Sequence, residues 1–531
     1  MAQILNDPDG LVNLRNLAQV VERTAPSPPD KSIPIVFVPG FSGWGAPLLG
    51  AINYFGGVID MPNLLLDEGY TVIVAPVAPI STNWERACEL YRQLTFGRFS
   101  TVNPNTRVIN EVYDVDIDYG TYFPAGPHAP DDTTRTGQTK TTDRRRAILF
   151  SNSPNFRRWK WDREHKVHFV CHSQGGNTVR YLIGLMANGA GALHSEYFSQ
   201  AGRDDWTVSV TTIGTPHRGT TLINALQGFL SRSRLRAVGL VARFFATASF
   251  YPPGRRAYDL QLDHWGIRRN AGETFQQMLV RMEADNGPVW KWLNSDNNGL
   301  YDNSIEGVHD LSQRVPNTSE NIFYFSLSFH ATEPFPEAWP PWGRDAIDSF
   351  PTSIENFVRR VIGPIPILGW LMEIIINAFT DIGWVILIVM TNFRSFVEWV
   401  TEAVMTRLLR ELGYDLVLPK PGRYIPRNDV MPILVLSVYA MGSQELSQQQ
   451  RNILGPNLED WYQNDGVVNT ASMSGPENAV SAISSLPDFN FNTDGKRGTY
   501  WHFGVNNRMD HADEIGVFIE QDTVSVRNSC Y

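Results

Sequence analysis

The stretch VHFVCHSQGGNTVRYLIGLM, residues 167–186, constrains the fold more than any other part of the chain. It begins as an apolar run typical of a buried strand, breaks at a polar corner around Ser173, and resumes with the apolar spacing of a helix. A tight strand-to-helix turn of this kind exposes a serine hydroxyl above the edge of a sheet, and residues two positions away must be small. Cys171 and Gly175 meet this requirement. The context predicts a nucleophile elbow at Ser173, although an isolated S-x-G match is more often an ordinary turn.

Apolar runs of the same kind recur along the chain, and helical patterns or long loops separate them. Strands that alternate with helices predict a mainly parallel α/β sheet with right-handed crossovers. Residues 99–146 are polar and turn-rich, so we expect a long excursion from the sheet there. The other predicted strands lie at 33–38, 71–75, 208–213 and 323–328.

The composition indicates a globular chain and excludes some classes of partner. The 531 residues are 42% hydrophobic and carry a formal net charge of −10, whereas nucleic-acid binding needs a basic surface. Three cysteines allow at most one disulfide. The N-terminal residues lack the basic start and apolar core of a secretory signal, so we expect an intracellular protein or a mature secreted form.

Two later residues complete a catalytic set with the serine. A serine nucleophile needs a base, and the base needs an orienting acid. In an α/β-hydrolase the chain order is serine, acid, histidine, so the search is restricted to residues after 173. Asp465 in an Asn-Asp-Gly turn and His511 near the C-terminus have this order. Each alone is a weak signal, since such turns are common and a lone histidine is more often structural.

The tetrahedral intermediate of acyl transfer needs two backbone donors. One is expected to be the N–H of Gln174, directly after the nucleophile. The other is expected to be Phe41, in the glycine-rich segment 38–45 that follows the first predicted strand. The alternative for this segment is a flexible turn at a strand end.

With these residues in view, the sequence resembles the bacterial thermoalkaliphilic lipases of the Geobacillus and Staphylococcus type. The likeness covers most of residues 33–330 and 428–517, in the family's order. It implies a triad of Ser173, Asp465 and His511 and oxyanion donors at Phe41 and Gln174. The matching strings are PGFSGWG (39–45), YFGG (54–57), GYTVIVAPVAPISTNWERACELY (69–91), CHSQGGNTVRYL (171–182), SVTTIGTPHRGTTL (209–222), LQLDHWGIRR (260–269), NDGVVNTASMSGP (464–476) and MDHADEIGV (509–517).

The resemblance also implies two metal sites, with departures from the family pattern. For zinc, Asp263 matches one aspartate, Glu85 replaces the other, and His128 is alone where the family has two histidines. A site that lacks one nitrogen ligand binds zinc more weakly, so we expect less than one equivalent. A hydrogen-bonded structural cluster is the alternative. For calcium, Asp513 matches one ligand, but Phe518 stands where the next carboxylate is expected. The chemistry itself requires no cofactor.

Two apolar segments have expected roles at a lipid surface. Residues 222–251 mix apolar and arginine side chains and match the family's lid, although a permanent surface helix is the alternative. Residues 361–412 predict an inserted helical hairpin, in which Glu373 and Asp381 interrupt the long apolar run. Carboxylates near a bilayer centre are costly, so we expect contact with the lid or with lipid, or burial against the core, rather than a span.

Together these features predict an α/β-hydrolase fold, a mainly parallel sheet flanked by helices, with a helical lid and an inserted hairpin. We expect an N-terminal extension (1–32), a core (33–332 and 428–531) and an apolar helical insertion (333–427). The predicted function is a serine lipase that acts on triacylglycerols or related lipid esters at an interface, with peripheral membrane contact through 361–412. The alternatives are a phospholipase, short-chain esterase or acyltransferase on the same triad, and a non-catalytic lipid-surface binding protein.

Overall fold

A computed structural model describes residues 9–24, 30–334 and 424–517, with short gaps in the last two ranges. The predicted hairpin (361–412) therefore lies outside the described residues, as does the end of the chain after 517. The gaps are 49, 58, 96–98, 104–105, 107–108, 111–112, 115–117, 122–138, 142–143, 191–194, 226–233, 428–429, 432–433, 457 and 483–495.

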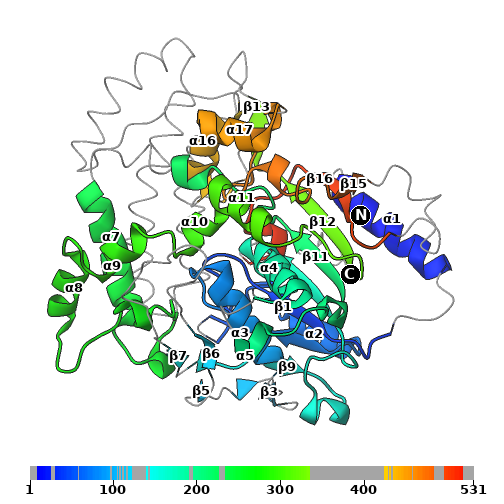
Figure 1. Ribbon diagram of the computed structural model, residues 1–531, viewed down its shortest axis with the longest axis horizontal. Helices are drawn as coiled ribbons and strands as arrows, with labels where there is room; N and C mark the ends of the chain where they lie inside the picture. The colour runs from blue at the N-terminus through cyan, green and yellow to red at the C-terminus, as the bar shows by residue number, and fades with distance from the viewer. Residues whose placement is uncertain are drawn as a thin grey trace.

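A ten-stranded, mostly parallel sheet forms the centre of the molecule (Figure 1). Its strand order is β15-β16-β12-β11-β10-β1-β2-β9-β3-β4, and the antiparallel pairs are β2 with β9 and β3 with β4. The predicted parallel α/β sheet is confirmed. The strands are β1 (Ile35–Val38), β2 (Val72–Val74), β3 (Ser100–Val102), β4 (Ile109–Asn110), β9 (Ile148–Phe150), β10 (Val167–His172), β11 (Thr207–Ile213), β12 (Phe323–Phe329), β15 (Val480–Ala482) and β16 (Tyr500–Asn506).

The central strands are apolar on both faces because both faces are covered. Along β1, Val36 and Val38 belong to one buried cluster and Phe37 belongs to another, since successive side chains of a strand point to opposite faces. In β10, Phe169 shares the cluster of Val36, and Cys171 pairs in register with Val38. Continuous apolar runs were therefore a sound signal for these strands.

Helices pack on the sheet and carry the elements of the site. The helices α3 (Asn83–Thr95) and α4 (Gln174–Asn188) contact each other, and both contribute to the buried cluster of Val36. Leu66 of α2 (Met61–Asp67) belongs to the cluster on the other face. The described part of the chain also contains α11 (Ile305–Arg314), α16 (Val435–Ser443), α5 (Ser195–Phe198), α10 (Gly299–Asn303) and α17 (Gln448–Leu454).

The N-terminal extension forms a helix that the sequence analysis did not predict. This helix, α1 (Asp9–Thr24), contacts β16 and lies beside β15 in Figure 1. Leu17 and Val20 are buried, each 7% exposed.

Part of the predicted excursion at 99–146 belongs to the sheet instead. Strands β3 and β4 extend the sheet edge, because Val102 and Ile109 pack against the buried cluster of Phe37. Two further antiparallel pairs follow, and residues 122–138 lie outside the described part. These pairs are β5 (Tyr113–Asp114) with β8 (Arg144–Arg145) and β6 (Asp118–Thr121) with β7 (Thr139–Thr141). Elsewhere, β13 (Thr332–Pro334) pairs with β14 (Tyr424–Pro426).

A third apolar cluster joins helices that lie at one side of the sheet (Figure 1). It is formed by α7 (Arg234–Ser249), α8 (Phe275–Glu283) and α9 (Pro288–Leu293), with Phe245 and Trp292 packed edge to face at its centre. Helix α7 falls within the predicted lid, of which 226–233 are not described. Among the helices that the structure describes, none has the length and apolar character that crossing a membrane requires.

Candidate active site

Ser173 occupies the strained corner that its sequence context predicts. It lies between β10 and α4 with φ 53° and ψ −130°, a backbone conformation that residues other than glycine rarely adopt. Its N–H donates to the carbonyl of Ile213 in the neighbouring strand, at 2.9 Å. Strain of this kind persists only where the surrounding structure holds it, and here it presents the serine above the carboxyl edge of the sheet.

The glycines around the corner allow three chain segments to meet. A Cβ atom on Gly175 would lie 2.5 Å from the carbonyl oxygen of Val38, and one on Gly40 would lie 2.5 Å from the Cβ of Ser173. Real Cβ atoms do not approach other atoms so closely. The glycine-rich segment after β1 is thus held directly against the nucleophile.

Arg86 of α3 fixes this segment from beneath. Its guanidinium is buried and donates to the carbonyls of Pro39, Gly40 (3.3 Å) and Ala78 (2.8 Å). Burial lowers the pKa of Arg86 to about 10, so the side chain keeps its charge at neutral pH. A buried charge shared among backbone carbonyls gives the loop a defined shape rather than the flexibility of an ordinary turn.

The two predicted oxyanion donors belong to the two segments that meet at the nucleophile. Gln174 is the first residue of α4, where N–H groups have no partner within the helix. Its side chain is turned away and donates to the carbonyl of Ser81 at 3.1 Å. Phe41 follows Gly40 and packs against the α7–α9 cluster. A Cβ on Gly299 would contact both Phe41 and Gln174, at 3.0 and 3.1 Å, so these two side chains border the same space.

His511 and Asp465 form a close pair. The Nδ1 atom of His511 lies 2.7 Å from Oδ2 of Asp465, whose side chain is fully buried. The other carboxylate oxygen, Oδ1, accepts the N–H groups of Val467 and Val468 at 2.8 and 2.7 Å. Burial alone would raise the pKa of Asp465, but His511 and these hydrogen bonds outweigh it and hold the pKa below its ordinary value. Asp465 is therefore an ionised acceptor.

The imidazole of His511 packs against the residue that precedes the nucleophile. Its ring centroid is 4.4 Å from that of His172, the residue directly before Ser173. Burial lowers the pKa of His511, and the negative charge of Asp465 raises it, so that the pKa ends above the ordinary value of imidazole. The structure thus gathers all three residues predicted for the triad at one edge of the sheet.

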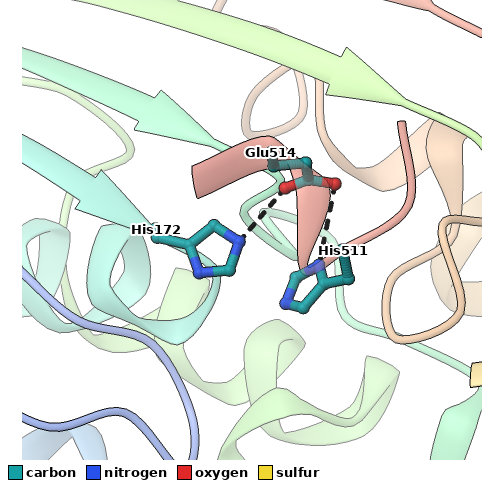
Figure 2. Close-up of side chains that lie close together, drawn as sticks. All are labelled: His172, His511 and Glu514. Atoms are coloured by element: carbon teal, nitrogen blue, oxygen red, sulfur yellow. Dashed lines mark hydrogen bonds and ion pairs between the residues drawn. The ribbon is translucent and has the colours of Figure 1, made fainter. Parts of the chain in front are cut away.

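A glutamate that the sequence analysis missed lies between the two histidines (Figure 2). Oε2 of Glu514 is 3.1 Å from Nε2 of His172, and Oε1 is 3.7 Å from Nδ1 of His511. Burial and the nearby charge of Asp465 raise the pKa of Glu514 well above its ordinary value, which favours the neutral acid. The sequence signal was slight: a glutamate one helical turn after the candidate base.

The residues predicted for zinc have other partners in the described part. Arg256 forms a two-armed ion pair with Asp263, at 2.8 and 2.7 Å, and Glu85 lies 3.7 Å from Nε2 of His264. His128 lies outside the described residues. The positive charge of Arg256 pairs with Asp263 in the way that the charge of a metal ion would. This ion pair favours the alternative of a hydrogen-bonded structural cluster over a zinc site.

Asp513, predicted for calcium, accepts the N–H of Asp510 at 3.4 Å in the turn that carries Glu514. Within the described ranges, His172, His511 and Glu514 are the one group of three potential metal ligands whose ligand atoms lie within 4.8 Å of one another. Of these atoms, Nδ1 of His511 is already hydrogen-bonded to Asp465, which favours a hydrogen-bonded network over a metal centre.

Part of the chain is similar in sequence to known lipases. The lipase-like C-terminal domain family matches residues 156–336. The lipase of Staphylococcus hyicus is 28% identical over 58% of this chain and 42% of its own length. A Staphylococcus epidermidis lipase is 27% identical over 56% of this chain and 38% of its own length. The chain thus spans about two fifths of the length of the curated relatives it matches.

Solved structures show the same fold. EstA from Clostridium botulinum superimposes with a TM-score of 0.56 at 22% identity, covering 96% of this chain and 89% of that chain. The Staphylococcus hyicus lipase structure gives a TM-score of 0.53 at 20% identity, covering 93% and 91%. Lipase 1 from Pelosinus fermentans gives 0.52 at 24% identity, covering 94% and 98%. The chain is thus similar in sequence to Staphylococcus lipases, and it has the fold of these lipase and esterase structures, which is α/β-hydrolase-like.

Proposed function

We propose that this chain is a lipase, a serine carboxylic-ester hydrolase that acts on lipid esters. The observation that carries the proposal is the placement of the His511–Asp465 pair beside the strained corner of Ser173. This placement supports a serine–histidine–acid constellation, which is recognised by geometry and roles rather than by spacing in the sequence.

In the proposed reaction, the Ser173 hydroxyl attacks the ester carbonyl while His511 takes its proton. The C–O bond to the alcohol then breaks, and His511 returns that proton to the leaving alcohol. His511 then takes a proton from water as the water attacks the acyl-enzyme. The bond between the acyl carbon and Ser173 Oγ breaks, and His511 returns the proton to Ser173 as the fatty acid leaves. Asp465 holds the imidazole in the required tautomer and stabilises its charged form.

The backbone N–H groups of Phe41 and Gln174 are proposed to bind the oxyanion. Support comes from the close contact of Gly40 with Ser173 and from the position of Gln174 at the first turn of α4. Donors that are fixed before the reaction stabilise the developing charge without reorganisation. Arg86 binds the carbonyls of Pro39 and Gly40. Because the C=O and N–H of one planar peptide unit point in opposite directions, the N–H of Phe41 points away from Arg86.

The proposed substrate is a triacylglycerol or related lipid ester at a lipid–water interface. The relatives are named lipases, and the apolar α7–α9 cluster reaches Phe41 at the site. Helix α7, in the predicted lid, is proposed to cover or uncover the acyl site, and residues 361–412 to contact the lipid surface. Zinc and calcium are proposed to be dispensable for the chemistry.

Initial rates on a long-chain triacylglycerol emulsion and on a soluble short-chain ester test this proposal. We expect turnover of both, a higher rate on the emulsion, and loss of both in Ser173→Ala. Activity on the soluble ester alone would assign a short-chain esterase instead. No turnover of either substrate, with retained emulsion binding, would assign a binding protein.

A further inference from the structure

A chain of hydrogen bonds begins at the loop proposed to bind the oxyanion and runs toward the base. The N–H of Gly40 donates to the hydroxyl oxygen of Tyr54 at 3.0 Å. That hydroxyl lies 2.7 Å from Nδ1 of His172. Since the phenol oxygen already accepts from Gly40, its own O–H is the donor to the imidazole. Burial raises the pKa of Tyr54, so the phenol keeps this proton.

The direction of this first bond fixes the next one. With Nδ1 of His172 as an acceptor, the proton of the neutral ring is on Nε2, and Nε2 donates to Oε2 of Glu514 at 3.1 Å. Burial lowers the pKa of His172 well below its ordinary value, which keeps the ring neutral. The side chains of His172 and Glu514 are 2% and 0% exposed, so water does not compete for these bonds.

The second oxygen of Glu514 reaches the catalytic pair. Oε1 lies 3.7 Å from Nδ1 of His511 and makes no hydrogen bond to a described residue. Figure 2 shows the carboxyl group above both imidazole rings, in contact with each. A buried polar oxygen without a hydrogen-bond partner destabilises the fold. A functional role can explain why Oε1 nonetheless lies beside Nδ1 of His511, and orientation of the base is such a role.

We propose that Glu514 is a positioning residue that joins His511 to His172 and, through Tyr54, to the oxyanion loop at Gly40. The inference rests on the proposed function and deepens it. The triad and the oxyanion loop come from distant parts of the chain, and His172 and Glu514 are 342 positions apart. The hydrogen bonds from Gly40 through to Glu514, together with the 3.7 Å contact between Glu514 and His511, keep the base and the loop in register during the reaction. Misplacement of reacting groups by about 1 Å can cost on the order of a hundredfold in rate.

Kinetics of Glu514→Ala and Glu514→Gln on a soluble ester test the proposal. We expect Glu514→Ala to lower kcat about tenfold or more with little change in KM, because the orientation of the base changes but substrate binding does not. Glu514→Gln keeps an acceptor for His172 and should restore most of kcat. Wild-type kcat in Glu514→Ala, or equal losses in both variants, would overturn the proposal.

Asp204→Ala is the matched control for the loss of a buried carboxylate. Asp204 is 8% exposed and accepts hydrogen bonds from Ser319 and Asn321. It lies just before the amino end of β11, whereas the catalytic residues lie at the carboxyl ends of the strands. The variant should lose stability but keep kcat. The Nδ1 proton resonance of His511 should shift in Glu514→Ala and stay in place in Asp204→Ala. A resonance that moves in neither variant would contradict a contact between Glu514 and the base.

Tyr54→Phe tests the end of the hydrogen-bond chain that is farthest from His511. It also provides an independent test if the Glu514→Ala protein does not fold. It removes one hydroxyl from between Gly40 and His172. We expect a several-fold loss of kcat and little further loss when it is combined with Glu514→Ala, because both act along one chain. Unchanged kcat in Tyr54→Phe, or fully multiplicative losses, would overturn the proposal. Turnover that survives Ser173→Ala would instead refute the proposed function itself.

Discussion

The Nδ1 atom of His511 lies 2.7 Å from Oδ2 of Asp465, although the two residues are 46 positions apart in the chain. A second bond, from the N–H of His511 to the carbonyl of Asp465 at 3.0 Å, fixes the backbones of the two turns as well. The orientation of the imidazole is therefore set by the fold before substrate binds. Pre-set orientation is what a general base requires.

Replacement of Asp465 with asparagine tests the role of the acid. The amide has the shape of the carboxylate but favours the wrong histidine tautomer, so kcat should fall by about ten-thousandfold. The far-ultraviolet circular dichroism spectrum should stay that of the wild type. Near-normal turnover in a folded Asp465→Asn protein would mean that another residue is the acid.

The pH dependence of kcat/KM should report the pKa of His511. The groups that face this imidazole are the carboxylate of Asp465, the neutral acid of Glu514 and the neutral ring of His172. Asp465 stabilises the charged imidazole, and only the neutral imidazole can act as base. Activity should therefore be lost on the acidic side at a pH above the ordinary pKa of histidine. Asp465→Asn should move that limb to lower pH. A shift to higher pH would contradict the assigned interaction.

Gly40→Ala should inactivate the protein by steric contact. The added Cβ would lie 2.5 Å from that of Ser173 and 2.8 Å from the Tyr54 hydroxyl. We expect a loss of turnover on the order of a hundredfold and of stability by about 1–3 kcal/mol. The control is Gly239→Ala in α7, where the nearest atom is 3.9 Å away and alanine should stabilise the helix by about 0.5–1 kcal/mol. Thermal unfolding and ester hydrolysis measure both effects. Equal activities of the two variants would contradict the close contact.

The sequence was sufficient for features that depend on local pattern. The strands at 33–38, 71–75, 167–171, 208–213 and 323–328 were predicted because a strand covered on both faces must be apolar along its length. The corner at Ser173 was predicted because the small neighbouring residues and the pattern of the following helix lie within 20 consecutive residues, 167–186. The order of Asp465 and His511 made both residues candidates, and the resemblance of the surrounding strings to the lipase family assigned them to the triad.

Contacts between distant segments were not predictable in this way. Glu514 shows no pattern in the sequence that points to His172, and Arg86 reads as one polar residue on a helix. The helix α1 was not predicted, because the prolines that follow it, at 26, 28 and 29, are typical of a linker. Each of these residues acquires its role from a partner that only the folded chain brings near.

The apolar segment 361–412 stays a prediction, because it lies outside the described residues. Replacement of Trp384, Ile386 and Ile388 with serine should weaken binding to a lipid emulsion and spare hydrolysis of a soluble short-chain ester, since a large apolar patch usually marks an interface. A joint loss of both activities with a large drop in Tm would identify a core element instead. Unchanged emulsion binding in the folded variant would refute the docking role.

Covalent labelling of Ser173 tests the central claim most directly. An activated alkyl phosphonate ester reacts with a serine only where a base and an oxyanion site activate it. Incubation with such a reagent, followed by mass spectrometry of the peptide that contains Ser173, should show one phosphonyl group per chain on Ser173 and a matching loss of ester turnover. His511→Ala should abolish the labelling. Turnover that survives complete labelling of Ser173, or labelling of a different residue with loss of turnover, would contradict the account.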